Sequence, residues 1–120
     1  MMKYERAFDV EKKILKIIDV LQLHHIDKMR LHCFRSYGSS SKAVARCYAL
    51  GKIWQSALNI NAHYIIEVLS EKFDKLSEKE KTKVLLHELL HIPKKFGGGF
   101  RHHDYACRKN VEALYKQLKQ

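Results

Sequence analysis

Residues 63–92 read HYIIEVLSEKFDKLSEKEKTKVLLHELLHI and contain a strand signal followed by a helix signal. The segment 63–69, HYIIEVL, is rich in β-branched and aromatic side chains, which favour a strand. Ser77 and Glu80 form an S-x-x-E capping box, in which each side chain satisfies a free backbone N–H of the first helical turn. We expect the helix to run to about Ile92, because Pro93 cannot continue it without losing a hydrogen bond.

The sequence on either side of this stretch predicts a small α+β domain. Residues 5–23 carry apolar side chains at helical spacing, and about 104–119 repeat that pattern at the end of the chain. Further strands are expected at 29–35 and 43–50, so the sheet should be mainly three-stranded. Residues 52–60 fit either a short helix or an extended segment, with Trp54 expected in the core. We interpret residues 1–120 as one domain.

Composition narrows the class of protein without deciding its function. The 120 residues carry a formal net charge of +10, which favours encounters with nucleic acid or other acidic partners. The charges are spread along the chain, however, and this is typical of solvated helix faces. No apolar run is long enough to span a membrane. The three cysteines form no CxxC pair and the N-terminus lacks a secretory signal, so we expect a cytoplasmic protein with reduced thiols.

The motif that carries chemistry is H-E-x-x-H, formed by His87, Glu88 and His91 on the predicted helix. Positions i and i+4 lie on one helical face about 6 Å apart, so both imidazoles can reach one cation. A catalytic Zn²⁺ site uses three protein ligands and leaves one position for water. Glu88 lies beside that face and can act as general base toward this water. We therefore expect one zinc ion, although iron, cobalt or nickel accept similar histidine sites.

A third metal ligand is expected beyond the glycine run at 97–99. We favour His103, with His102 and Glu112 as alternatives, because the glycines allow the chain to turn back toward the helix. The metzincin pattern is excluded, since it requires a glycine at Lys94 and a histidine at Gly97. Asp104 could orient a ligand or cap the last helix.

The stretches HELLHIP (87–93) and FGGGFRHH (96–103), with RSYGSSSKAVAR and IWQSAL upstream, resemble a known family. They are similar to small metallopeptidases of archaea and phages, minimal zincins related in architecture to SprT-like peptidases. The resemblance covers roughly 29–104 and implies a zincin fold with His87 and His91 as ligands and Glu88 as general base. The family's L-R-x-H pattern places its histidine at His103, with Phe100 standing where the leucine is usual.

The resulting hypothesis is a zinc-dependent peptidase acting on a peptide or protein substrate. Zincins bind an extended peptide at a sheet edge, and residues 43–49 are our candidate edge strand. Tyr48, Tyr105 and Arg101 are candidates for stabilising the oxyanion. The alternatives are a nucleic-acid-associated protein, which could cleave DNA-bound proteins, and a non-catalytic domain stapled by zinc. The remaining histidines are interpreted as structural or surface residues: His24, His25, His32 and His63.

Overall fold

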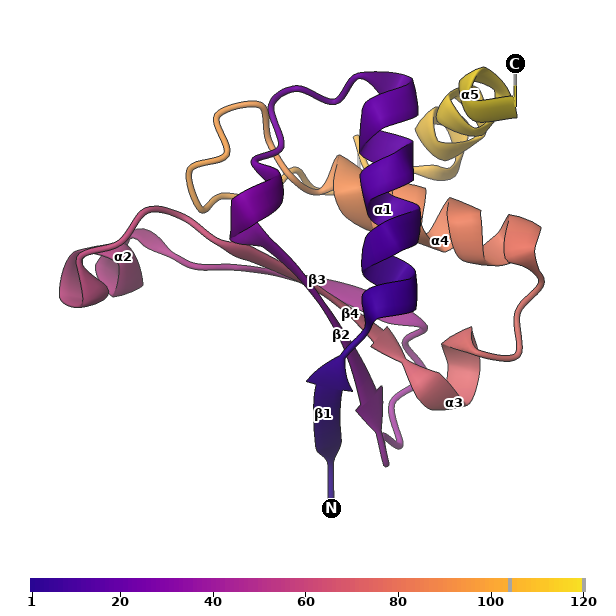
Figure 1. The fold of residues 1–120 in the computed structure, drawn as a ribbon, viewed down its shortest axis with the longest axis horizontal. Coiled ribbons are helices and arrows are strands. Elements are labelled where there is room, and N and C mark those ends of the chain that lie inside the picture. The colour runs from indigo at the N-terminus through magenta and orange to yellow at the C-terminus, as the bar shows by residue number, and fades with distance from the viewer. Residues whose placement is uncertain (104, 120) are drawn as a thin grey trace.

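A computed structural model describes residues 1–103 and 105–119 and has the α+β fold that the sequence predicts (Figure 1). The elements run in the order β1 (Lys3–Arg6), α1 (Phe8–Leu21), a short 3₁₀ turn (Lys28–Arg30), β2 (Leu31–Tyr37), β3 (Ala45–Ala49), α2 (Lys52–Leu58), β4 (Tyr64–Leu69), α3 (Ser70–Phe73), α4 (Glu78–Leu90) and α5 (Arg108–Lys119). No helix within the described ranges combines the length and apolarity needed to cross a bilayer.

The described strands form one sheet in the order β1–β2–β4–β3. Strands β2 and β4 are parallel, while β1 and β3 are antiparallel to their neighbours. Strand β3 is an edge strand, as expected of 43–49, because it pairs only with β4 in the part of the chain described. Strand β1 is a fourth strand, added to the three that the sequence predicts. All four of its residues are exposed, so no apolar alternation marks it and only pairing with β2 reveals it.

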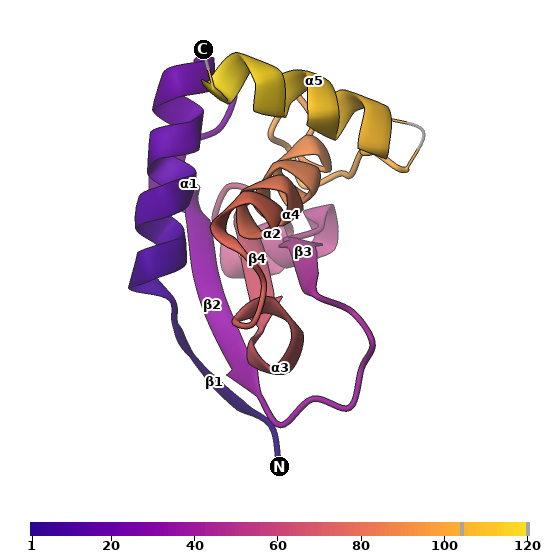
Figure 2. The ribbon, with the colours of Figure 1, turned by 90° about the vertical axis from the view of Figure 1, so that its right-hand side faces the viewer.

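The core lies between one face of the sheet and the helices α1, α4 and α5, which Figures 1 and 2 show on the same side. The inner face of the sheet contributes alternate residues of β2 and β4, which are Leu31, Cys33, Tyr64, Ile66 and Val68. Helix α1 contributes the stripe expected from its periodicity, which is Val10, Ile14, Ile17 and Ile18. Helix α5 packs against both α4 and α1, and so closes the core over the site-bearing helix (Figure 2).

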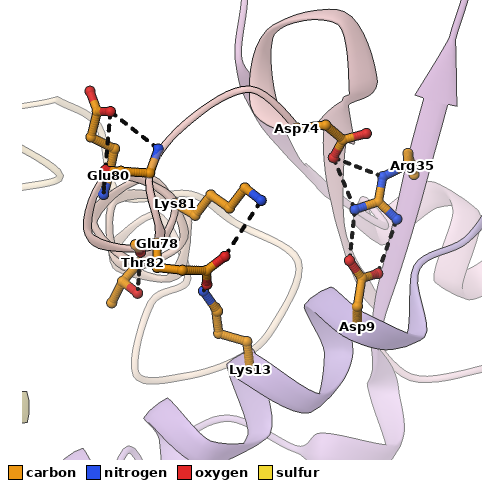
Figure 3. Close-up of polar contacts among 9 residues, drawn as sticks. Asp9, Lys13, Arg35, Asp74, Glu78, Glu80, Lys81 and Thr82 are labelled. Atoms are coloured by element: carbon orange, nitrogen blue, oxygen red, sulfur yellow. Dashed lines mark hydrogen bonds and ion pairs between the residues drawn. The ribbon is translucent and has the colours of Figure 1, made fainter.

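Helix α4 begins and ends where the sequence predicts. The capping box is present, because Ser77 Oγ accepts a hydrogen bond from Glu80 N and the Glu80 side chain accepts one from Ser77 N (Figure 3). The helix ends at Leu90 and His91 is its C-cap residue, two positions before Pro93. The four buried leucines at 85, 86, 89 and 90 fix the rotation of the helix about its axis.

Ion pairs fix the start of α4 relative to α1 and the sheet. Arg35 of β2 donates two hydrogen bonds to Asp9 of α1, at 2.8 and 3.0 Å, and one to Asp74 at 3.2 Å (Figure 3). The guanidinium of Arg35 therefore holds the pKa of Asp9 below its ordinary value. Lys13 of α1 pairs with Glu78 in the first turn of α4. The Arg35 side chain is only 13% exposed, whereas that of Asp9 is 66% exposed, so solvent still screens this pair.

Helix α2 lies at the end of the sheet that is distant from α1, α4 and α5 (Figure 1). None of its residues is buried, and Trp54 is 59% exposed. The expectation that Trp54 belongs to the core is wrong. A seven-residue segment with three large apolar side chains resembles a buried element in sequence, but here it protrudes beyond the helices that could cover it.

Candidate metal centre

Helix α4 places His87 and His91 on one face, one turn apart. Their ring centroids are 5.0 Å apart, and both side chains are half-buried. The buried leucines on the other side of the helix pack into the core and so turn this face away from it. Burial, followed by the neighbouring His91 and His103, lowers the pKa of His87. A lowered pKa favours the neutral imidazole, which is the form that binds a metal.

The segment after Pro93 turns back and is held by Tyr64 of β4. The Tyr64 hydroxyl donates to the carbonyl of Gly99 at 2.7 Å and accepts from Gly98 N at 3.0 Å. Phe96 packs on the same ring, with centroids 4.8 Å apart. Arg101 N then donates to the carbonyl of His91 at 2.7 Å. These contacts return the chain to the end of α4, as the glycine run predicts.

The returning chain brings His103 beside the two histidines of α4. The candidate ligand atoms of His87, His91 and His103 all lie within 4.8 Å of one another. The ring centroid of His103 is 5.5 Å from that of His87 and 5.1 Å from that of His91. These distances suit three imidazoles around one cation.

The two alternative third ligands lie outside this cluster of described residues. His102 is exposed and does not belong to it. The carboxylate of Glu112 accepts from Lys83 Nζ at 2.7 Å, and Lys83 holds the pKa of Glu112 below its ordinary value. Asp104, considered above as an orienting or capping residue, lies outside the described residues.

Glu88 is buried, with 7% of its surface exposed, and lies between the two histidines in sequence. Burial raises the pKa of Glu88 to about 7, because desolvation penalises the charged carboxylate. Cys47, on the inner face of β3, is close enough for Glu88 to contribute to its raised pKa of about 12, although burial is the main cause. The carboxyl group is therefore poised to exchange a proton near neutral pH.

A cleft of about 630 Å³ opens beside Glu88 and His87. It is bounded by the edge of the sheet, by α4 and by α5, and its lining residues include Val44, Ala45, Lys83, Val84, Arg108 and Val111. The cleft therefore connects His87 and Glu88 with the start of the edge strand β3. A volume of this size can hold part of a peptide.

The three candidates for oxyanion stabilisation lie elsewhere. Tyr48 points to the outer face of the sheet, where its hydroxyl donates to Glu67 at 2.5 Å. Arg101 and Tyr105 contact each other, with the guanidinium carbon 4.0 Å from the ring centroid, and line a separate cavity of about 220 Å³. The expectation for these residues arose from residue type alone, and the alternation of β3 turns Tyr48 away from the cleft.

Sequence reasoning also missed a histidine pair. His32 Nε2 and His63 Nδ1 are 2.8 Å apart and their rings are stacked. The two residues are 31 positions apart in sequence and meet only because β2 and β4 are adjacent and parallel. No local spacing could have indicated this pair.

An α+β fold in which one helix and a returning loop gather three histidines beside a buried glutamate defines a class of metal-binding proteins. A family model described as "putative phage metallopeptidase" matches residues 2–119, and the chain belongs to this family. The resemblance drawn from the sequence is confirmed at that level. No curated protein and no solved structure gives a match. Membership of a metallopeptidase family implies a metal ion, and the histidine cluster is able to hold one.

Proposed function

We propose that the chain is a zinc-dependent peptidase in which His87, His91 and His103 hold one Zn²⁺ and Glu88 is the general base. The observation that carries the proposal is the approach of the ligand atoms of the three histidines to within 4.8 Å of one another, beside a cleft that His87 and Glu88 line. Three imidazole nitrogens suit zinc, which binds histidine at about 2.0–2.1 Å in a tetrahedron.

The chemistry divides between the metal and the side chain. When bound, the zinc ion supplies a Lewis acid that acidifies a water molecule and polarises the scissile carbonyl. Glu88 accepts the proton of the attacking water and transfers it to the amine nitrogen that leaves. In the metal-free chain burial raises the pKa of Glu88 to about 7, and this burial favours uptake of a proton by the carboxylate.

The substrate that fits is an extended peptide. Strand β3 has a free edge among the described strands, and its first residue Ala45 lines the cleft together with the preceding Val44. An extended peptide can pair with such an edge and so present a bond to the histidine cluster. Arg108 and Lys83 at the cleft wall would then face its side chains.

A purely structural zinc site is less well supported. Such sites use four protein ligands and are closed to substrate. Within the described residues, the cluster provides three histidines and faces a cleft. The general base would also have no function in a structural site.

The variant Glu88→Gln tests the mechanism. It removes the base while keeping the shape of the side chain, so we expect peptide cleavage to fall by at least about 100-fold, the usual contribution of a general base. Zinc content, measured by mass spectrometry of the metal, should remain at one ion per chain. Cleavage at an undiminished rate by this variant would overturn the mechanism.

The adjacent histidines provide a matched pair for the third ligand. We expect His103→Ala to weaken zinc binding strongly, while His102→Ala, one residue away, likewise exposed but outside the cluster, should leave it near the level of the unaltered chain. Affinity is measured by competition with a chromophoric chelator. If His102→Ala releases zinc and His103→Ala does not, the assignment of the ligand is wrong.

A further inference from the structure

Helix α2 contributes no buried residue to the fold, yet one of its side chains reaches back toward the rest of the molecule. Gln55 is half-buried, while the other residues of the helix are exposed. Its Nε2 donates hydrogen bonds to the carbonyl oxygen of Leu50, at 2.8 Å, and to that of Gly97, at 3.0 Å. An amide nitrogen carries two N–H donors, so both are engaged. One of them ties α2 to the loop that follows α4.

This loop depends on hydrogen bonds, because burial does little to fix it. None of residues 97–103 is buried, and the glycines at 97–99 leave the backbone many conformations. Tyr64 holds Gly98 and Gly99 from the side of the sheet. Gln55 holds the same turn from the side of α2, and its Nε2 is only 2.5 Å from the place where a Cβ at Gly98 would lie. The turn is thus clamped between two elements that are distant from it in sequence.

The clamped turn precedes the third histidine of the cluster. His103 is exposed, whereas His87 and His91 are half-buried on a helix that the core fixes. The positions of His87 and His91 therefore follow from the packing of α4, while that of His103 follows from the course of the loop. The backbone contacts between Arg101 and His91 also guide this course. Freedom in the glycine turn would strain these contacts and displace His103.

The order of the loop affects a metal ion through its ligands. A ligand that is already in place costs less to order on binding, and so raises the affinity. Loss of a group that orients a ligand typically lowers metal affinity by about 10–100-fold. The amide of Gln55 is engaged with Leu50 and Gly97, so it acts on the histidines only through the loop.

We propose, on the basis of the proposed function in which His103 is the third ligand, that Gln55 is a positioning residue of the metal centre. Its amide holds the glycine turn so that His103 lies beside His87 and His91 before the metal binds. Helix α2 thereby has a function within the fold, because it carries this clamp although it adds nothing to the core.

The variant Gln55→Met keeps the length of the side chain and removes both donors. The matched control is Gln117→Met, the same substitution at an exposed position of α5 whose side chain has no hydrogen bond among the described residues. Zinc affinity is measured by competition with a chromophoric chelator. We expect Gln55→Met to bind zinc about tenfold more weakly than the unaltered chain, and Gln117→Met to bind it equally well.

A double-mutant cycle separates positioning from general destabilisation. If Gln55 acts through His103, Gln55→Met should cause no further loss of zinc affinity in a chain that already carries His103→Ala. A side chain that only stabilised the fold would lower the affinity in both backgrounds. Amide hydrogen exchange of the metal-free chain is the second readout. We expect faster exchange at residues 97–103 in Gln55→Met, with exchange in α4 unchanged.

A second variant, Gln55→Glu, places a carboxylate against the two carbonyl oxygens and should weaken zinc binding at least as much. It serves as the test if Gln55→Met does not fold. Undiminished zinc affinity in these variants overturns the clamp and leaves the assignment of His103 standing. A loss that persists with His103→Ala also overturns it, because Gln55 would then act on the fold as a whole. If His103→Ala itself leaves zinc affinity unchanged, the ligand assignment fails and the clamp fails with it.

Discussion

At the scale of single residues, His91 shows how one hydrogen bond selects a ligand atom. Its Nδ1 lies 2.7 Å from the carbonyl oxygen of Arg101. A carbonyl can only accept, so Nδ1 carries the proton and the lone pair of Nε2 is left for a cation. The backbone N–H of Arg101 donates in return to the carbonyl of His91. The same pair of residues therefore orients one ligand and returns the chain toward His103.

The pair of His32 and His63 gives a prediction about pH. Burial, and secondly the neighbouring His63, lower the pKa of His32 from its ordinary value of 6.5. His32 therefore binds fewer protons in the folded chain than in the unfolded chain as the pH falls through 6.5, so its own contribution to the free energy of unfolding decreases on acidification. Glu88, whose raised pKa acts in the opposite direction, is common to both chains, so we expect His32→Gln to gain in free energy of unfolding relative to the unaltered chain as the pH falls from 7.5 to 5.5. Urea unfolding of the metal-free chain at each pH provides the measurement.

The exposed His24 provides the control for this pH dependence. The variant His24→Gln should keep the pH dependence of the unaltered chain. An unchanged slope in His32→Gln would show that the histidine pair makes no contribution.

At the scale of elements, the loop after α4 depends on one glycine. Gly98 has φ of 103°, and a Cβ there would lie 2.6 Å from the carbonyl oxygen of Leu50 and 2.5 Å from Gln55 Nε2. We expect Gly98→Ala to lower the free energy of unfolding by about 1–3 kcal/mol, because both the backbone and the contact are strained. Zinc affinity should fall with it, since this loop carries His103.

Gly99 is the matched control for Gly98. A Cβ at Gly99 meets nothing within 4 Å, so Gly99→Ala should change the free energy of unfolding by less than about 0.5 kcal/mol. Chemical unfolding of both variants checks the difference. Equal losses in the two variants would contradict the prediction, because the contact at Gly98 would then not be the cause of the destabilisation.

The elements also show what local signals can predict. The capping box, the stop before Pro93 and the β-branched and aromatic content of 63–69 each act within a few residues, and the elements that they predict are confirmed. Strand β1 was missed because its four exposed residues lack an apolar pattern. Trp54 was assigned to the core because residue type indicates burial only when a neighbouring element is present to cover it.

At the scale of the whole molecule, the apolar core predicts that folding does not require the metal. Buried hydrophobic residues from α1, α4, α5 and the sheet form one cluster. We therefore expect the chelated chain to keep its helical circular dichroism and to unfold in a single transition, as the single domain predicted for residues 1–120 requires. Zinc at 100 times its Kd should add about 2.7 kcal/mol, or roughly 10 °C in Tm.

The measurement for this prediction is thermal unfolding with zinc and with excess chelator. It also separates a catalytic metal from a structural one. Loss of the helices on chelation would contradict the prediction. It would favour a non-catalytic domain whose fold depends on bound zinc.

The sequence by itself determined the α+β class, the course of α4 and the spacing of His87, Glu88 and His91, because helix caps and periodicity act between neighbours in the chain. Only the tertiary structure decided which later histidine lies beside them, since this depends on how Tyr64 and Gln55 hold a loop distant from them in sequence. The same is true of Glu67 and of the paired histidines. Their surroundings come from the order of strands in the sheet, which depends on long-range pairing and leaves no local pattern.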